Sequence, residues 1–199
     1  MERLAAPGGP TNGQILRPGD NKEIESIAFV QCAGSRDENH LEYCSYICCM
    51  ASMKQITYVR ERYPEIPITV FYIDIRTPGK YEKFRDKLMA DENITFIKGK
   101  VADIIPEGDG SVTVVAENAV TGEKIQQKVD MAVLATGMEP AGKDQAAALG
   151  VAVDGNGFIV SDADKGMLSA GCAKKASDVV TSTQNATAAA LKAIQASRR

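Results

Sequence analysis

The stretch "IESIAFVQCAGSRDENHLEYCSYICCM" (residues 24–50) begins with an apolar run and then holds four of the chain's five cysteines. Residues 24–32 are typical of a short buried strand, because apolar side chains dominate them. After the cysteines, apolar side chains recur at helical spacing until Pro64 and Pro67 end the pattern. We therefore predict a strand, a cysteine-rich connection and a helix.

The segments that follow repeat this alternation. Residues 66–76, "IPITVFYIDIR", form a near-continuous apolar run, as in strands that are buried on both faces of a parallel sheet. Residues 77–91 have the pattern of a charged amphipathic helix, and residues 93–105 that of a further strand. The β-α-β-α-β order predicts an α/β fold, a doubly wound nucleotide-binding-like domain with a parallel sheet.

The pattern changes after residue 105. Two strands at 111–117 and 124–129 are expected to form a β-meander around a turn at Thr121-Gly122. The sequence also predicts an apolar strand "MAVLATG" (131–137), a hairpin at 151–161 and an alanine-rich helix that starts at Ser182 or Thr183. The predicted domains are a linker (1–22), a degenerate pyridine-nucleotide-type domain (23–137) and part of a second domain (138–199).

The composition is that of an ordinary globular protein of one or two domains. The chain has 199 residues, of which 44% are hydrophobic and 25% charged, with a formal net charge of −3. Charges of both signs are interspersed, which argues against nucleic acid or an anionic membrane as a partner. The first residues lack the apolar core of a secretory signal, and no apolar run approaches the roughly 18 residues of a spanning helix. We expect a cytoplasmic protein.

The cysteines follow the spacing C-x11-C-x3-C-C, formed by Cys32, Cys44, Cys48 and Cys49. Four converging thiolates suit a tetrahedral zinc or an iron–sulfur cube, and zinc sites usually show C-x2–4-C pairs that are absent here. A helix N-terminus at Cys48-Cys49 would stabilise the negative charge of a cluster. Three alternatives stay open: buried thiols, a vicinal Cys48–Cys49 disulfide, and a lone reactive Cys32.

The connection after the first strand lacks a phosphate-binding loop. A dinucleotide fold places G-x-G-x-x-G at this point, whereas this connection holds a single glycine, Gly34. Asp74, at the end of the second strand, could mimic a ribose-binding acid, but a surface carboxylate is the better interpretation without the glycines. The cysteines therefore occupy the place where phosphates would bind.

These residues resemble a known family. The runs "FVQCAGSRDENHLEYCSYICCMASMK" (29–54), "VFYIDIRTPGKYEKF" (70–84), "MAVLATGMEP" (131–140) and "SAGCAKKASDVVTSTQNATAAALKAIQ" (169–195) resemble the A subunit of heterodisulfide reductase. Within that group the best match is the flavoprotein A subunit of the quinone-interacting membrane-bound oxidoreductase complex of sulfate reducers. The resemblance implies the C-terminal half of a two-dinucleotide-fold flavoprotein related to thioredoxin reductase.

The resemblance also implies two cofactors, a 4Fe-4S cluster and FAD. The cluster ligands would be Cys32, Cys44, Cys48 and Cys49. The segment 138–199 would be the C-terminal part of an FAD-binding domain. The residues at the flavin would be Thr136 and Gly137 at a strand end, Gly171 and Cys172 in the motif near the ribityl chain, and Gln184, Asn185 and Ala186 at a helix start aimed at the isoalloxazine ring.

Two departures from the family pattern qualify the FAD site. Cys172 stands where the wider superfamily has aspartate, so the ribityl hydrogen bond is lost or weakened, and we expect a packed thiol there. The G-x-G-x-x-G that holds the FAD pyrophosphate is absent from this chain. FAD is therefore expected to be shared with a missing N-terminal half, and to bind weakly or not at all without it.

The resemblance implies an electron-transfer module that relays electrons between FAD and partner subunits. The implied partners are the subunits of a heterodisulfide reductase-like complex, adenylylsulfate reductase and a membrane quinone-interacting subunit, with attachment to the inner membrane face through them. One alternative is a dithiol–disulfide oxidoreductase, which normally needs a C-x-x-C pair that this chain lacks. Another is a non-catalytic assembly module. The chain alone is not expected to show the full enzymatic activity.

Overall fold

The computed structural model describes residues 1–198, which divide into two compact units. The first unit joins residues 1–33 to residues 48–136. The second joins residues 34–47 to the chain from Gly137 onward. The boundaries between the units therefore fall on either side of the segment that carries Cys44.

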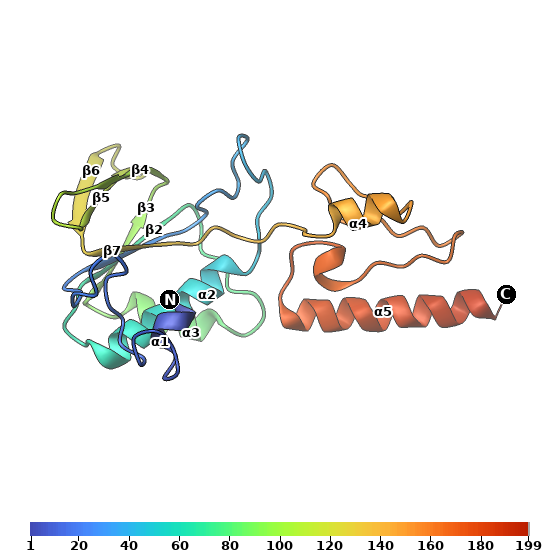
Figure 1. The fold of residues 1–199 in the computed structure, drawn as a ribbon, viewed down its shortest axis with the longest axis horizontal. Coiled ribbons are helices and arrows are strands. Elements are labelled where there is room, and N and C mark those ends of the chain that lie inside the picture. The colour runs from blue at the N-terminus through green and yellow to red at the C-terminus, as the bar shows by residue number, and fades with distance from the viewer. Residues whose placement is uncertain (199) are drawn as a thin grey trace. The chain divides into compact units, whose positions relative to one another are not determined.

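A parallel sheet forms the centre of the first unit, with the strand order β3-β2-β1-β7 (Figure 1). Its strands are β1 (Ile27–Val30), β2 (Ile68–Tyr72), β3 (Ile94–Lys98) and β7 (Met131–Leu134). All three strand pairs are parallel, and every residue of β1 is buried. Helices α2 (Cys48–Arg62) and α3 (Glu82–Met89) connect β1 to β2 and β2 to β3. The predicted β-α-β-α-β order is confirmed.

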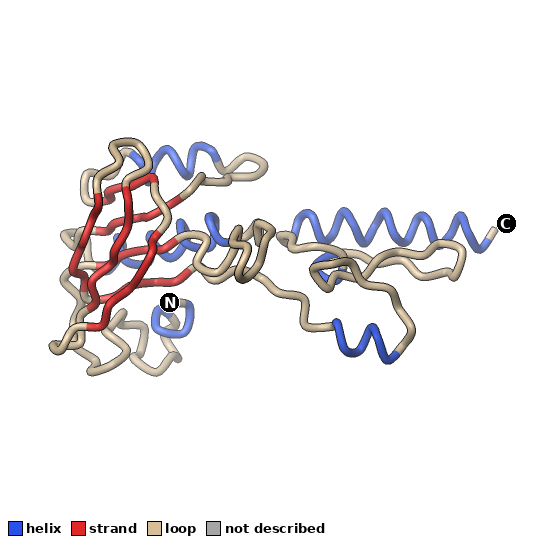
Figure 2. Tube along the Cα trace, turned by 90° about the horizontal axis from the view of Figure 1, so that it is seen from above, coloured by secondary structure: helices blue, strands red, loops and turns tan. Residues whose placement is uncertain are grey.

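Both faces of this sheet are covered, which explains the unbroken apolar strands. On one face, Ile27 and Phe29 of β1 pack in a core cluster with Met53, Ile56 and Val59 of α2. The other face is covered by an antiparallel sheet, in which β4 (Val101–Pro106), β5 (Val112–Glu117) and β6 (Lys124–Val129) lie in sequence order. In Figure 2 the strands of the first unit are drawn in red and its helices in blue.

The strand predicted at 93–105 is wrong as a single element. It divides into β3 and β4, which belong to different sheets. Gly99 lies at the break, and a Cβ at this position would overlap the carbonyl oxygen of Glu117, so only glycine fits the crossing. The predicted meander of β5 and β6 is confirmed, with Gly122 at φ 74° in its turn.

The N-terminal segment packs against the first unit. It contains a short helix, α1 (Glu2–Ala5), and a fully buried Ile15 whose amide donates to Tyr63 Oη at 3.1 Å. Residues 1–22, which we expected to form a linker, thus contribute to the core.

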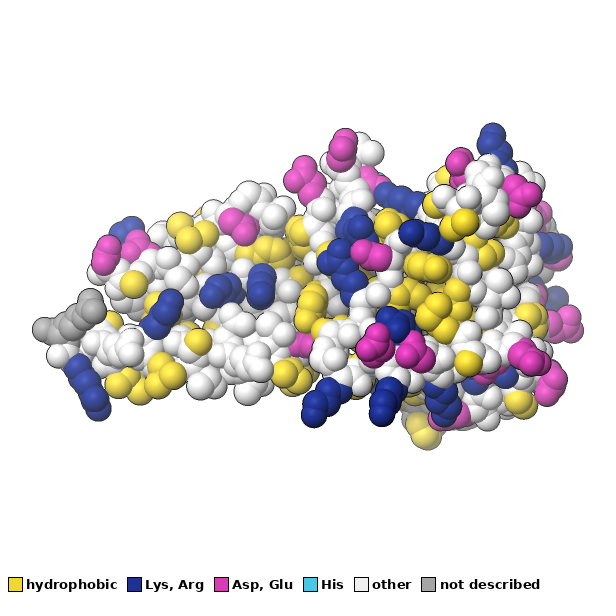
Figure 3. Space-filling model, turned by 180° about the vertical axis from the view of Figure 1, so that it is seen from behind, with side chains coloured by type: hydrophobic (Ala, Val, Ile, Leu, Met, Phe, Trp, Pro, Cys, Tyr) yellow, Lys and Arg dark blue, Asp and Glu magenta, His cyan; other side chains and the backbone are white. Residues whose placement is uncertain are grey.

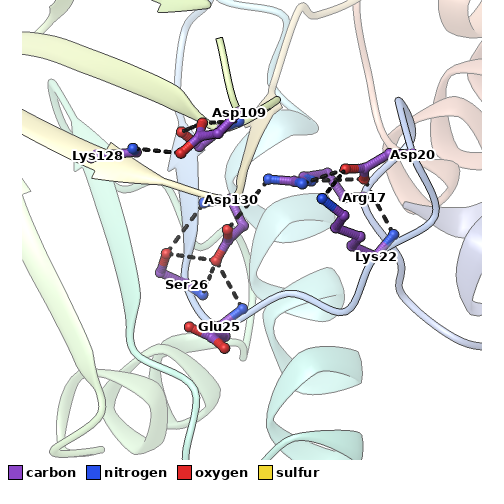
Figure 4. A network of polar contacts seen from close by, with 9 residues as sticks. Arg17, Asp20, Lys22, Glu25, Ser26, Asp109, Lys128 and Asp130 are labelled. Atoms are coloured by element: carbon purple, nitrogen blue, oxygen red, sulfur yellow. Dashed lines mark hydrogen bonds and ion pairs between the residues drawn. The ribbon is translucent and has the colours of Figure 1, made fainter. Parts of the chain in front are cut away.

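A polar network fixes the same segment near the start of β1 (Figure 4). The buried guanidinium of Arg17 binds the carboxylate of Asp20, with Nε 2.8 Å from Oδ1, and its Nη1 lies 3.7 Å from Asp130 Oδ1. Asp130 Oδ2 accepts hydrogen bonds from the amides of Glu25 and Ser26. The hydrogen bond from Arg17 lowers the pKa of Asp20 well below its usual value. These contacts connect three separate stretches of the first unit.

The second unit contains α4 (Lys143–Ala148), a 3-10 turn η1 (Gly171–Ala173) and α5 (Val179–Ser197). The hairpin predicted at 151–161 is reduced to an isolated bridge between Val153 and Ile159. The predicted start of α5 at Ser182 or Thr183 is wrong, because Asp178 caps the helix by accepting a hydrogen bond from the amide of Thr181 at 2.7 Å.

The surface gives two further observations. On the face drawn in Figure 3, acidic and basic side chains are interspersed rather than gathered by sign. No helix among residues 1–198 is both long and apolar enough to cross a bilayer.

Candidate metal centre

The connection from β1 to α2, residues 31–47, is called the cysteine loop below. Cys32 follows the end of β1 directly, is 7% exposed and has a φ of 56°. This left-handed conformation is uncommon for residues other than glycine. Arg36 and Tyr46, in the same loop, also have positive φ, at 55° and 68°. Such strained conformations concentrate at functional sites, which makes this loop the first candidate in the molecule.

Cys48 and Cys49 are the first two residues of α2, as the sequence predicted. The first backbone N–H groups of a helix lack partners within it, and together they give its N-terminus a partial positive charge. The first turn of α2 holds no acidic residue. Cys48 is half-buried, and Cys49 is buried, with its thiol 3.8 Å from the carbonyl oxygen of Asp74 as a donor. A thiolate at this position would be stabilised by the helix terminus.

Cys44 lies in the part of the cysteine loop that belongs to the second unit. Its sulfur accepts a hydrogen bond from the amide of Tyr46 at 3.3 Å. The same part of the loop is anchored by Tyr43, whose hydroxyl donates to the carbonyl oxygen of Met138 at 2.9 Å and whose ring meets Phe158 edge to face. Burial of the Tyr43 ring and the nearby carboxylates of Glu139 and Asp154 raise the pKa of its hydroxyl.

The structure therefore brings three of the four predicted ligands, Cys32, Cys48 and Cys49, into one unit, and Cys44 into the other. Residues 1–198 contain no group of three or more His, Cys, Asp or Glu side chains that could hold a metal ion. The ligand role of the four cysteines stays a prediction.

Gln31, the residue before Cys32, was missed by the sequence reasoning. It is 4% exposed, and its Oε1 has no hydrogen-bond partner among the described residues. An unsatisfied buried carbonyl costs about 1–3 kcal/mol, so its retention calls for a reason. The available signal was a polar residue in the inward register of an apolar strand.

The residues expected at the flavin lie in the second unit, except Thr136, which ends the first. Gly171 has a φ of 58° and is buried against Ser182 of α5. Cys172 is exposed, so the expected packed thiol is wrong for the described chain; its sulfur lies 3.5 Å from the carbonyl oxygen of Ser177.

Three of the expected flavin residues, Gln184, Asn185 and Ala186, lie inside α5 rather than at its start, because the helix already begins at Val179. Gln184 and Ala186 are exposed, and Asn185 donates from its side chain to the carbonyl oxygen of Thr181 at 2.8 Å. Their role at a flavin stays a prediction, as does that of Gly137.

An open cleft of about 680 Å³ lies beside the ends of β2 and β3. Its lining includes Asp74, Arg85 and Lys98. Asp74 pairs with Arg76 at 3.3 Å, and both side chains are substantially exposed. This placement agrees with the interpretation of Asp74 as a surface carboxylate.

The solved structures most similar to this chain include two thioredoxin reductases. The enzyme from T. acidophilum superposes with a TM-score of 0.58 at 16% identity, over 87% of this chain and 53% of its own. The enzyme from Lactococcus lactis gives 0.55 at 15% identity, over 86% and 54%. These likenesses concern the fold alone and confirm the predicted α/β fold of the two-dinucleotide-fold flavoprotein superfamily.

No model of a known protein family matches the chain. Three curated proteins match 98% of it: the iron-sulfur A subunit 2 of CoB–CoM heterodisulfide reductase from Methanopyrus kandleri at 35% identity, the A subunit of ferredoxin/F420H2-dependent CoB–CoM heterodisulfide reductase from Methanosarcina acetivorans at 36%, and a protein of Archaeoglobus profundus named as like the heterodisulfide reductase A subunit, at 34%. The chain spans 32%, 26% and 32% of their respective lengths. It is thus homologous, over almost all of its length, to a segment of the A subunit of heterodisulfide reductase, and the family resemblance is confirmed.

Proposed function

We propose that this chain is the electron-transfer segment of an iron–sulfur flavoprotein. In this proposal Cys32, Cys44, Cys48 and Cys49 bind a 4Fe-4S cluster, which supplies storage of single electrons when bound. The observation that carries the proposal is the placement of thiols at a strand end and at the first turn of the next helix. A dinucleotide fold binds phosphate at this place, and a cluster carries the same sign of charge.

The donor set of the chain fits such a cluster. Cys32 and Cys49 are buried, which limits the access of water, and the α2 N-terminus favours negative charge next to Cys48 and Cys49. The role of Cys44 rests on its sequence position, four residues before Cys48, and on the homology to subunits whose names include iron–sulfur. The C-x3-C-C spacing does not resemble the paired knuckles of structural zinc sites.

FAD, in this proposal, is shared with a flavin-binding segment outside this sequence. The glycine loop that binds a pyrophosphate is absent from the 199 residues. Helix α5 contains no buried residue and leaves Val179, Val180, Leu191 and Ile194 between 49% and 82% exposed. Yellow hydrophobic side chains are visible on the surface in Figure 3. An apolar helix of this kind is suited to packing against the remainder of a flavin domain.

The partners in this proposal are the other subunits of a heterodisulfide reductase-like complex. Adenylylsulfate reductase and a membrane quinone-interacting subunit would be the partners if the complex is of the sulfate-reduction type. The chain would then work in the cytoplasm and reach the membrane only through those subunits. None of the described helices could provide a direct anchor.

The test is anaerobic preparation of the chain, with iron, sulfide, zinc and flavin analysis, alone and together with the flavin-binding segment of a relative. We expect brown protein that absorbs near 400 nm, with about four irons per chain, and flavin only in the presence of the added segment. Colourless protein that retains one zinc after reconstitution would refute the cluster. Reversible cycling of two thiols in iron-free protein would favour the dithiol–disulfide alternative.

A further inference from the structure

Gln31 continues the inward face of β1 toward helix α2. Side chains of a strand alternate between its faces, so Ile27, Phe29 and Gln31 share one side. Ile27 and Phe29 pack in the core cluster that includes α2. The amide of Gln31 still donates to the carbonyl oxygen of Phe71 at 3.0 Å, so the pairing with β2 fixes the direction of the Gln31 side chain.

This side chain reaches a small void together with Cys49. The other lining residues are all apolar: Met53, Ile56, Val70, Ile75 and Phe96. Gln31 is 4% exposed, and its Oε1 lacks a hydrogen-bond partner among the described residues. Gln31 is the one lining residue whose side chain carries N–H groups, and Cys49 is the one whose side chain becomes charged.

Metal ligation changes what the sulfur of Cys49 can do. The thiol now acts as a donor toward the carbonyl oxygen of Asp74 at 3.8 Å. A metal-bound cysteine has lost its proton, so its sulfur can only accept hydrogen bonds. Rotation about the last torsion of Gln31 exchanges its oxygen for its NH2 group, which can then donate.

We propose that the side-chain amide of Gln31 donates a hydrogen bond to the sulfur of Cys49 in the cluster-bound protein and thereby raises the reduction potential of the cluster. The inference rests on the proposed function. A reduced cluster carries one more negative charge than an oxidised one, so an N–H donor stabilises the reduced form more. Gln31 is a positioning and tuning residue, because it acts through Cys49.

A buried water is the competing explanation for the unpaired oxygen. The void measures about 10 Å³, close to the smallest space that a single water occupies. A water would also supply an exchangeable proton near the sulfur. The test must therefore separate the amide from a water.

The test uses the full chain reconstituted anaerobically with iron and sulfide, and iron is measured first. Redox titrations followed by EPR compare the wild type, Gln31→Met and the control Met53→Leu. Methionine keeps the length of glutamine without its N–H donors, and Met53→Leu alters the same void at nearly constant volume. Pulsed EPR of reduced protein in D2O then detects exchangeable deuterons next to the cluster.

We expect Gln31→Met to lower the ratio of reduced to oxidised cluster about tenfold at a fixed solution potential, equal to about 59 mV for one electron. Met53→Leu should leave the potential unchanged, and the deuteron coupling of the wild type should be lost in Gln31→Met. Equal potentials in iron-loaded wild type and Gln31→Met would overturn the inference. A coupling that persists in Gln31→Met, or is absent from the wild type, would overturn it too. Wild-type protein that binds no iron would instead overturn the proposed function and, with it, this inference.

Discussion

The hydroxyl oxygens of Ser35 and Ser45 lie 3.0 Å apart, and both residues are only 1% exposed. Ser45 Oγ also accepts a hydrogen bond from the amide of Met138 at 2.9 Å. Gly137, with a φ of 97°, passes so close that a Cβ there would overlap both hydroxyls. The part of the cysteine loop that carries Cys44 is therefore fastened to the residues that follow Thr136.

Gly137→Ala should loosen this fastening. The left-handed backbone alone costs about 1–3 kcal/mol for a residue with a Cβ, and the overlap with the two hydroxyls adds to it. We expect faster hydrogen exchange throughout residues 34–47, measured by mass spectrometry. Gly150→Ala is the matched control, because Gly150 has a φ of 66° with no atom near its Cβ position. Equal effects of the two substitutions would contradict the close approach.

Ser45→Ala should act on one amide. Its removal leaves the N–H of Met138 without its acceptor, at a cost of about 1–3 kcal/mol for a buried donor. The Met138 amide should then exchange faster with solvent, as NMR can measure residue by residue. Ser161→Ala serves as the control, because its hydroxyl bonds Ser169 elsewhere in the second unit. An unchanged Met138 exchange rate would show that the hydrogen bond is not formed in solution.

Arg17→Met should lower stability in a pH-dependent way. Arg17 holds the pKa of Asp20 below its usual value, so this carboxylate stabilises the fold above about pH 4, and the contribution is lost as the pH falls through the lower, folded-state pKa. The stability difference between wild type and variant should therefore be largest at neutral pH and shrink below about pH 4.

Urea unfolding at pH 7 and pH 3, followed by far-UV circular dichroism, measures this difference. Lys22→Met is the control, since Lys22 is 69% exposed and lies 3.4 Å from Asp20. Exposed ion pairs contribute little, so its effect should be small at both values. A stability loss in Arg17→Met that is the same at pH 7 and pH 3 would contradict the linkage to Asp20.

Asp178→Ala should fray the start of α5. Loss of a capping side chain costs about 1 kcal/mol, and the amide of Thr181 loses its acceptor. Asp178→Asn keeps a capping oxygen and should stay close to the wild type. The hydrogen bond from Thr181 lowers the pKa of Asp178, so an NMR titration of this carboxyl provides a second check. A Thr181 amide that exchanges at the same rate in all three proteins would refute the cap.

The sequence predicted what periodicity and glycine placement determine. The apolar runs at β1 and β2 identified the buried parallel sheet, and the adjacent Cys48 and Cys49 marked the start of α2. The division of residues 93–105 was missed because Gly99 matters only against Glu117, a contact between distant parts of the chain. The start of α5 was misplaced because Asp178 was overlooked in favour of the later hydroxyl residues.

The candidate site was predictable in its residue types and less so in its surroundings. Four cysteines in an otherwise glycine-poor connection identified the cysteine loop. The buried amide of Gln31 was not recognised, because an isolated polar residue at a strand end is usually solvent-exposed. The fastening of Ser35 and Ser45 to Gly137 joins segments about ninety positions apart, which no local pattern reveals.

The central claim is that four cysteines of this chain bind one 4Fe-4S cluster, and its most direct test is the iron content of five single Cys→Ser variants reconstituted anaerobically. We predict about four irons per wild-type chain, and severe loss in the variants of Cys32, Cys44, Cys48 and Cys49. Cys172→Ser, which changes an exposed thiol outside the motif, should retain the wild-type iron content and spectrum. Full iron in all five variants, or no iron in the wild type, would contradict the account.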